Sequence, residues 1–127
     1  MARHVLDSSV VIAAVFHEPG GDLLRELMPD ALMCAVNVTE IVTRLYDKGW
    51  PITLAAAETA KLVGRVAPFD DALAFVAGRL RVETRELSLS LGDRACLALA
   101  MAADLPVYTA DRDWGRLDLG LDIRLIR

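Results

Sequence analysis

The pattern that decides the fold lies in residues 90–103, which read Ser-Leu-Gly-Asp-Arg-Ala-Cys-Leu-Ala-Leu-Ala-Met-Ala-Ala. From residue 95 onward this stretch is apolar nearly all round, and a helix of that kind is buried on most of its sides, typically against a sheet. Ser90 fits the N-cap position, and Asp93 fits the reciprocal position of a capping box three residues later. The stretch therefore predicts a capped helix packed against a sheet.

Short apolar segments on both sides of this helix read as the strands of that sheet. They are bounded by prolines, glycines or polar residues and are a few residues long, as buried strands are. The predicted strands are residues 5–6, 32–36, 66–69, 107–109 and 123–126.

Helical patterns alternate with these strands. The predicted helices run from a Ser8 cap through Val15, over residues 23–28, from Asn37 through Tyr46, from a Thr53 cap to about Arg65, and from Leu73 to about Arg85. Breaks such as 19–21 and 48–51, rich in proline and glycine, separate them. Alternating strands and helices predict an α/β fold, a three-layer sandwich with a mainly parallel central sheet. Because there is no repeat, low-complexity tract or linker, we expect a single domain over residues 1–127.

Composition indicates a globular protein with reduced thiols. The chain has 127 residues, of which 54% are hydrophobic and 25% charged, far from a disordered profile. No stretch approaches the ~18 apolar residues of a membrane span, and the first apolar run is too short for a signal peptide, so we expect a cytoplasmic location. Cys34 and Cys96 lie in apolar surroundings without nearby ligands, which favours buried free thiols over a zinc site.

Four acidic residues occupy equivalent places relative to the predicted strands. Asp7 follows the first strand, Glu40 lies near the start of the helix after the second, Asp93 lies in the first turn of the buried helix, and Asp111 follows the strand at 107–109. In a parallel sheet these places share one edge, where ligands bind. Converging carboxylates raise each other's pKa unless a cation compensates them. The pattern predicts a Mg²⁺ or Mn²⁺ site suited to phosphodiester hydrolysis.

Three of these acids also have a structural interpretation, which the sequence leaves open. Asn37 and Glu40 are spaced as a capping box, as are Ser90 and Asp93, and Asp111 fits the cap of the turn that follows it. Asp7 is the hardest to explain in this way.

The net charge of −4 excludes neither interpretation. A protein that binds nucleic acid passively normally presents a basic surface, which this composition argues against. If the four acids are metal ligands, however, 14 of the 18 acidic residues remain against 14 basic ones. Bound divalent cations would then supply positive charge for a phosphate.

The short sequence motifs around the four acids occur in a characteristic order. They are Val-Leu-Asp7-Ser-Ser-Val-Val, Ala-Val-Asn37-Val-Thr-Glu40-Ile, Leu-Gly-Asp93-Arg-Ala-Cys-Leu-Ala-Leu-Ala and Val-Tyr-Thr-Ala-Asp111-Arg-Asp-Trp. Together they closely resemble the VapC-like toxins of the PIN-domain family, over nearly the whole chain. Each motif alone is weakly specific, whereas all four in this order are highly specific.

The resemblance implies a Mg²⁺- or Mn²⁺-dependent endoribonuclease that acts as the toxin of a toxin–antitoxin pair. It implies a VapB-like antitoxin as partner, a homodimer, and transfer or ribosomal RNA as substrate. On the family pattern the four acids are the metal ligands. Ser9, Asn37 and Thr109 match polar positions that orient ligands or water. Asp113 is a candidate auxiliary ligand, although that position is not reliably acidic in the family.

Several other residues are candidates for binding the substrate or the partner, or have a structural role. Arg94 and Arg112 adjoin site acids and are candidates for binding the scissile phosphate, with a solvated or ion-paired arginine as the alternative. The apolar stripe of Leu23, Leu24, Leu27 and Met28 is a candidate docking groove for the antitoxin, or else core packing. His4, His17 and the series Arg79, Arg81 and Arg85 are interpreted as structural or surface residues.

Three alternative functions were compared. A dehalogenase-type phosphatase needs a second acid where Ser9 stands, and a receiver domain needs an acidic pair and a late lysine that the chain lacks. The remaining alternative is a catalytically inactive PIN-fold protein that only binds a partner. Loss of an acid would indicate that function, and here all four acids are present.

Overall fold

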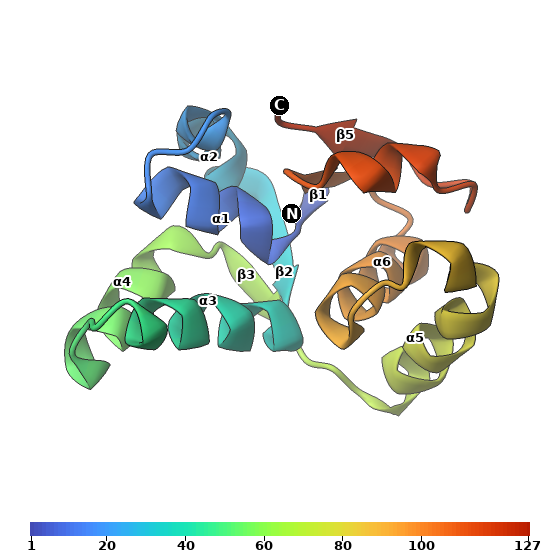
Figure 1. Cartoon of the computed structure of the whole chain (residues 1–127), viewed down its shortest axis with the longest axis horizontal. Helices are drawn as coiled ribbons and strands as arrows, with labels where there is room; N and C mark the ends of the chain where they lie inside the picture. The colour runs from blue at the N-terminus through green and yellow to red at the C-terminus, as the bar shows by residue number, and fades with distance from the viewer.

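Five short strands form one parallel sheet in the computed structural model, which describes all residues, 1–127 (Figure 1). They are β1 (His4–Leu6), β2 (Ala31–Cys34), β3 (Arg65–Ala67), β4 (Val107–Thr109) and β5 (Ile123–Leu125). Their order is β3-β2-β1-β4-β5, and every neighbouring pair is parallel. The sheet is thus wholly parallel, where the sequence predicted a mainly parallel one. Strand order reverses between β1 and β4.

Six helices cover the two faces of the sheet. They are α1 (Ser8–Val15), α2 (Leu24–Leu27), α3 (Ala35–Asp47), α4 (Ile52–Leu62), α5 (Asp71–Glu83) and α6 (Leu91–Ala103). Four single turns of 3-10 helix accompany them: η1 (Gly21–Leu23), η2 (Met28–Asp30), η3 (Arg85–Leu87) and η4 (Arg112–Arg116). Figure 1 shows α1 to α4 gathered on one side and α5 and α6 on the other.

Alternating strand residues divide the core into two halves. Val5 and Cys34 belong to a cluster with α5 and α6, while their neighbours Leu6 and Met33 belong to a second cluster with α1, α3 and α4. This follows from the strand geometry, which points successive side chains to opposite faces. The predicted three-layer α/β sandwich is confirmed.

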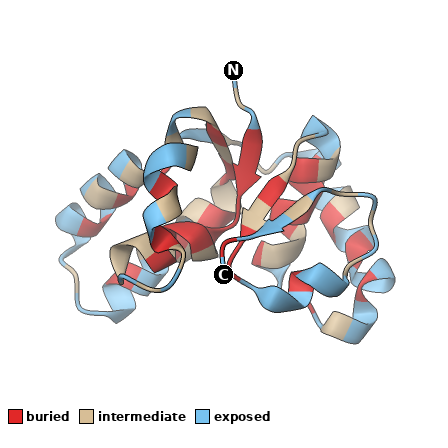
Figure 2. Ribbon diagram, turned by 90° about the horizontal axis from the view of Figure 1, so that it is seen from above, coloured by how far each residue is buried: buried red, intermediate tan, exposed pale blue.

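Helix α6 is the buried helix that the sequence predicted. Every residue from Ala95 to Ala100 is buried, which Figure 2 shows as a red segment beside the central strands. Its start is capped as predicted: the Asp93 N–H donates to the Ser90 hydroxyl at 3.1 Å, and the Ser90 N–H donates to the Asp93 carboxylate at 3.0 Å. Both features predicted from residues 90–103, the capped start and the buried middle of the helix, are confirmed.

Three predicted helix caps are wrong. Helix α1 begins at Ser8 itself with Asp7 in the N-cap position, because the Ser8 hydroxyl bonds to Glu40 rather than to its own helix. Helix α4 begins at Ile52 after Pro51, and so Thr53 lies inside it. Asn37 likewise lies in the third position of α3, whose N-cap is Cys34, and the Asn37–Glu40 capping box does not form. Short apolar runs such as 35–36 suit a strand or a helix equally, so the sequence placed these starts too late.

Several element ends also differ from the predictions. Strands β2 and β3 lie slightly earlier than predicted, and β5 ends at Leu125. The second helix is a single α-turn between two 3-10 turns. Helix α4 ends at Leu62, before Gly64, where a Cβ atom would lie 2.6 Å from the Ala31 carbonyl oxygen. Gly64 therefore allows the backbone to approach the start of β2 closely, which ends the helix earlier than its composition suggests.

The cysteines and His4 are structural residues, as predicted. Cys34 and Cys96 are buried and unbonded, and burial raises the pKa of both thiols. His4 is buried, with its Nε2 2.6 Å from the Leu27 carbonyl oxygen. None of the helices combines the length and the apolar composition needed to cross a bilayer.

Candidate active site

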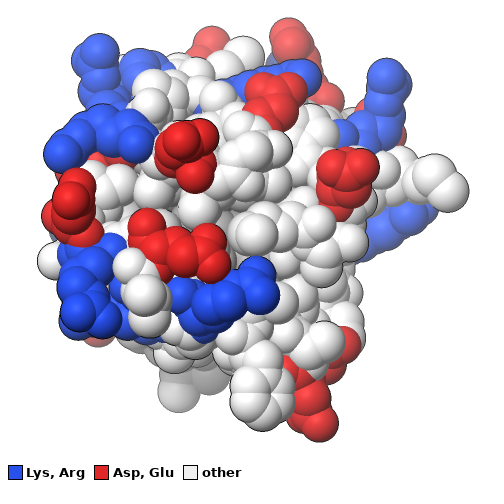
Figure 3. Space-filling model, turned by 90° about the vertical axis from the view of Figure 1, so that its right-hand side faces the viewer, with Lys and Arg blue, Asp and Glu red and all other residues white.

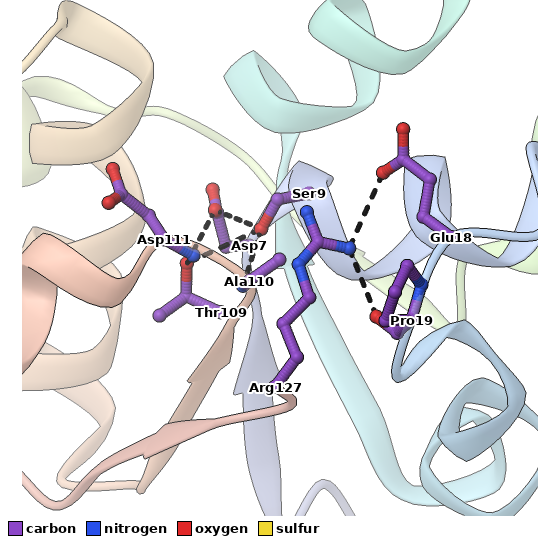
Figure 4. Close-up of polar contacts among 8 residues, drawn as sticks. All are labelled: Asp7, Ser9, Glu18, Pro19, Thr109, Ala110, Asp111 and Arg127. Atoms are coloured by element: carbon purple, nitrogen blue, oxygen red, sulfur yellow. Dashed lines mark hydrogen bonds and ion pairs between the residues drawn. The ribbon is translucent and has the colours of Figure 1, made fainter.

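The carboxylate of Asp7 is buried where β1 and β4 end side by side. Its Oδ2 accepts hydrogen bonds from the Ser9 hydroxyl at 2.6 Å and from the Thr109 hydroxyl at 2.9 Å (Figure 4). The Ala110 N–H donates to the Ser9 oxygen, and the Asp111 N–H donates to the Thr109 oxygen. This network joins the two strands at the point where strand order reverses, which is where open α/β sheets bind their ligands.

Glu40 is positioned by a hydrogen-bond network that involves three helices. Its Oε1 accepts from the Ser8 hydroxyl in α1 at 3.0 Å and from the Asn37 amide in α3 at 2.8 Å. The same amide donates to the Gly92 carbonyl oxygen in α6 at 3.0 Å. Asn37 is fully buried, and its own Oδ1 has no partner. The amide therefore fixes the carboxylate of Glu40 against the first turn of α6.

Gly92 leaves the space that the Glu40 carboxylate fills. A Cβ atom at position 92 would lie 2.1 Å from Glu40 Oε2 and 2.4 Å from its carboxyl carbon, far inside contact distance. Neither the contact of Gly92 with Glu40 nor the Ser8–Glu40 hydrogen bond was predicted from the sequence, in which Ser8 fits a helix cap. The only local signal for Gly92 is its unfavourable intrinsic helix propensity in an otherwise strong helix.

Asp93 and Asp111 are each held by local backbone hydrogen bonds. Asp93 uses Oδ2 in the capping box of α6, and Asp111 uses Oδ1 to accept from the Asp113 N–H at 3.0 Å, which caps η4. The structural interpretations of these two residues are therefore correct. They occupy only one oxygen of each carboxylate.

All four acids share this arrangement. The hydrogen bonds of each carboxylate fall on a single oxygen, namely Asp7 Oδ2, Glu40 Oε1, Asp93 Oδ2 and Asp111 Oδ1. The second oxygen of each carboxylate accepts no hydrogen bond from the protein. The scaffold thus orients four carboxylates and leaves one oxygen of each available to a hard cation.

The surroundings of Asp7 disfavour its charged form, chiefly through burial. Burial raises the pKa of its carboxyl from the ordinary 3.8 to about 6, against the lowering effect of the hydrogen bonds from Ser9 and Thr109. The charges of Asp93 and Glu40 raise that pKa further. A divalent cation at this place would remove the repulsion.

The four carboxylates have the chemistry to bind a metal ion, but their oxygens are not arranged around a common point. Oxygen donors from carboxylates are what Mg²⁺ and Mn²⁺ prefer. No three acidic, histidine or cysteine side chains already surround a common point at which they could hold an ion. Binding therefore requires the free oxygens to turn inward, and exposed Asp111 has the most freedom to do so.

The candidate auxiliary residues lie around this group without joining it. Arg94 is directed to α5, where its guanidinium donates to the Ala77 carbonyl oxygen at 2.9 Å. Arg112 and Asp113 are exposed, and neither side chain makes a hydrogen bond. Arg79, Arg81 and Arg85 are exposed too. Figure 3 shows basic and acidic side chains interspersed on the side of the molecule where α5 and α6 lie.

A hydrogen bond and an ion pair from Arg127 hold the loop that follows α1. Arg127 donates to the Pro19 carbonyl oxygen at 3.0 Å and pairs with Glu18 at 3.5 Å (Figure 4). Gly20 has a φ of +85°, and a Cβ atom there would lie 2.3 Å from the Ile126 carbonyl oxygen. Glycine is needed at this turn for both reasons.

Comparison with known proteins shows what the chain is similar to. Residues 4–119 match the family model described as "PIN domain". The VapBC complex from Salmonella typhimurium, solved bound to DNA, has a chain that superposes with a TM-score of 0.77 at 16% identity, with all of both chains covered. VapC20 from Mycobacterium tuberculosis, a toxin that cleaves the sarcin–ricin loop, gives 0.76 at 21% identity over 95% of this chain and 98% of that one.

A third solved structure has higher sequence identity. The VapBC-5 toxin–antitoxin complex of Mycobacterium tuberculosis gives a TM-score of 0.64 at 28% identity, over 100% of this chain and 99% of that one. No curated protein sequence matches.

The raised pKa of Asp7 predicts how its stability contribution changes with pH. Because the folded-state pKa, about 6, lies above the unfolded value near 3.8, the folded state holds this proton more tightly, and stability falls as pH rises between these values. The loss is at most about 3 kcal/mol. In metal-free buffer, Asp7→Asn should be more stable than the wild type at pH 7.5, with a smaller advantage at pH 4.5, in urea unfolding. Asp118→Asn, an exposed control, should show no such trend; an Asp7→Asn difference that is equal at both pH values would contradict the assignment.

The contact between Gly92 and Glu40 predicts opposite outcomes for two helical glycines. Gly78→Ala in α5 meets open space and should stabilise the protein by about 0.5–1 kcal/mol. Gly92→Ala should destabilise it by about 1 kcal/mol, because the overlap costs about 1–3 kcal/mol. In a Glu40→Ala background, Gly92→Ala should become stabilising, as measured by a double-mutant cycle. The same loss with and without Glu40 would show that the carboxylate does not set this requirement.

Proposed function

The chain belongs to the PIN domain family, and from that premise we propose that it is an endoribonuclease which depends on Mg²⁺ or Mn²⁺. The family is one of nucleases, and the observation that carries the proposal for this chain is the set of four carboxylates. Each is anchored through one oxygen and has the other free.

In the proposed site Asp7, Glu40, Asp93 and Asp111 would hold the metal through those free oxygens. When bound, the ion polarises a phosphoryl oxygen and lowers the pKa of a bound water. Hydrogen bonds within the chain would position the metal ligands. Ser9 and Thr109 hold the Asp7 carboxylate in place, and Asn37 does so for Glu40. A change in any of these donors would misdirect a ligand without removing it.

RNA is the substrate we propose. One structural neighbour, VapC20, cleaves the sarcin–ricin loop, and it shares only the fold with this chain at 21% identity. By analogy we propose a structured RNA, transfer or ribosomal, as the target. The alternative, a PIN-fold protein that only binds a partner, is less well supported, since such a protein has no need for four oriented carboxylates.

We further propose that the chain is a toxin, forms a homodimer and acts in the cytoplasm under control of a VapB-like antitoxin. Several structural neighbours were solved as toxin–antitoxin complexes. The candidate docking stripe is only partly available, because Leu24 is in the core while Leu23, Leu27 and Met28 are half-buried against it. Leu24 and Met28 do line an open pocket between α2 and α4 that also contains Arg25 and Lys61.

Asp22 and Glu26 also line that pocket, so its charges balance, and it suits an antitoxin segment with apolar residues and charges of both signs. We propose that an arginine elsewhere in the antitoxin binds the carboxylates. A guanidinium binds a carboxylate through two parallel hydrogen bonds and would compete with the metal.

The nuclease proposal predicts cleavage of purified RNA in Mg²⁺ or Mn²⁺ that EDTA abolishes. Asp7→Asn and Asp93→Asn should reduce the rate by at least about 100-fold while the protein stays folded, because the amide keeps the shape and removes the charge. Glu40→Gln should do the same with little change in melting temperature, since glutamine still accepts from Ser8 and Asn37. Full activity of one of these variants would remove that residue from the mechanism.

The toxin proposal predicts that expression of the chain alone arrests growth. Co-expression with the product of the adjacent small open reading frame should restore growth, and the two proteins should co-purify. Lys61→Glu, at the rim of the docking pocket, should weaken that complex without lowering nuclease activity, which size-exclusion chromatography and the RNA assay would measure. Harmless expression together with a neighbour that neither binds nor inhibits would refute the toxin role, even if the nuclease role survives.

A further inference from the structure

A second pocket opens beside Glu40, and the proposed chemistry does not use it. It has a volume of about 600 Å³ and is lined by residues of α1, α3 and the start of α6. Ile12, Val36 and Leu91 provide apolar surface, and Thr39 and Thr43 add polar side chains. The Thr39 hydroxyl donates to the Ala35 carbonyl oxygen and can still accept a hydrogen bond. The pocket therefore combines apolar surface with polar edges, next to a residue of the proposed metal site.

Arg44 is the only basic residue that lines this pocket. It lies four residues after Glu40 in α3, and residues four apart are neighbours on one helix face. Its exposed side chain makes no ion pair and no hydrogen bond, in contrast to Arg79, Arg124 and Arg127. An unpaired guanidinium is thus present beside the proposed metal site.

Leu91 adds an apolar surface to the same pocket from a different helix, α6. It is the first residue of α6, and 54% of it is exposed to solvent. The next residue, Gly92, is the one against which the Glu40 carboxylate lies. The exposed leucine side chain lies next to the proposed metal site, where it can pack against a planar group of a ligand.

The charges of the pocket favour a base over a phosphate. Glu40 and Asp47 also line it, so two acids face the single arginine and would repel a phosphate. A nucleobase carries no net charge, and its amino groups can donate to a carboxylate or a hydroxyl. Unpaired bases in RNA are recognised in this way, with one face stacked on an aromatic ring or an arginine plane.

We propose that this pocket is a subsite for one unpaired nucleobase of the RNA substrate, next to the scissile bond. Arg44 covers one face of the base, Leu91 packs on the other, and the threonine hydroxyls meet its edge. The inference rests on the proposed function, because it takes RNA as the substrate. It makes the target a loop or bulge instead of a continuous duplex, since a stacked and paired base cannot enter a pocket.

The test is RNA binding in EDTA, where no cleavage occurs. The probe is a fluorescently labelled single-stranded RNA of mixed sequence, and anisotropy gives the affinity. Arg44→Ala should weaken binding about tenfold, within the range measured for loss of base stacking. Arg44→Lys should weaken it nearly as much, because lysine keeps the charge and lacks the planar group. Leu91→Ser should also weaken it, whereas Arg81→Ala, an exposed and unpaired arginine on α5, should change it less than twofold.

The outcomes separate this subsite from the nuclease proposal. Arg44→Ala and Leu91→Ser behaving like Arg81→Ala would overturn the subsite, even with full cleavage by the wild type. Binding that depends on Arg44 and Leu91 would support it, even if the wild type cleaves no RNA in Mg²⁺ or Mn²⁺ and the nuclease proposal fails. If Arg44→Ala leaves RNA affinity unchanged and weakens the complex with the antitoxin, the pocket belongs to the protein partner and the base subsite is wrong.

Discussion

Asp7 keeps a carboxylate in the interior, at the junction of β1 and β4, with only 4% of the residue exposed and no ion pair to a basic residue. Burying a charge this way is costly unless hydrogen bonds or a cation compensate it. The hydroxyls of Ser9 and Thr109 provide part of that compensation, and they come from the two elements that meet at the switch in strand order. The same few hydrogen bonds therefore link the end of β1 to α1 and β4 at the site.

The structural and functional interpretations of the acids are compatible, because a carboxylate has two oxygens. Asp93 caps α6 and Asp111 caps η4, each through one oxygen. The capping bonds use only that oxygen, so the other oxygen can bind a ligand while the cap stays intact. Glu40 reaches the same state by a different route, through Ser8 and Asn37 rather than through its own helix.

Helix α6 connects the core to the site. Its buried middle, Ala95–Ala100, packs against the sheet and fixes the helix in place, so its first turn cannot shift relative to β1. Gly92 and Leu91 in that turn both line the pocket that contains Arg44, and Gly92 also contacts the Glu40 carboxylate. A well-packed interior is rigid, which is what a site that must position several groups requires.

Sequence patterns alone predicted the alternation of strands and helices, the burial of residues 95–100, the capping box at Ser90 and the placement of acids after strands. Each of these is a local pattern of periodicity or spacing, and such a pattern can be recognised in the sequence without knowledge of the fold. Tertiary structure alone decided the strand order, the start of α3 at Ala35 and the partners of Glu40. The Ser8–Glu40 and Asn37–Gly92 hydrogen bonds join residues 32 and 55 positions apart. Such contacts form only when packed helices bring distant segments together, and they leave no spacing in the chain from which they could be read.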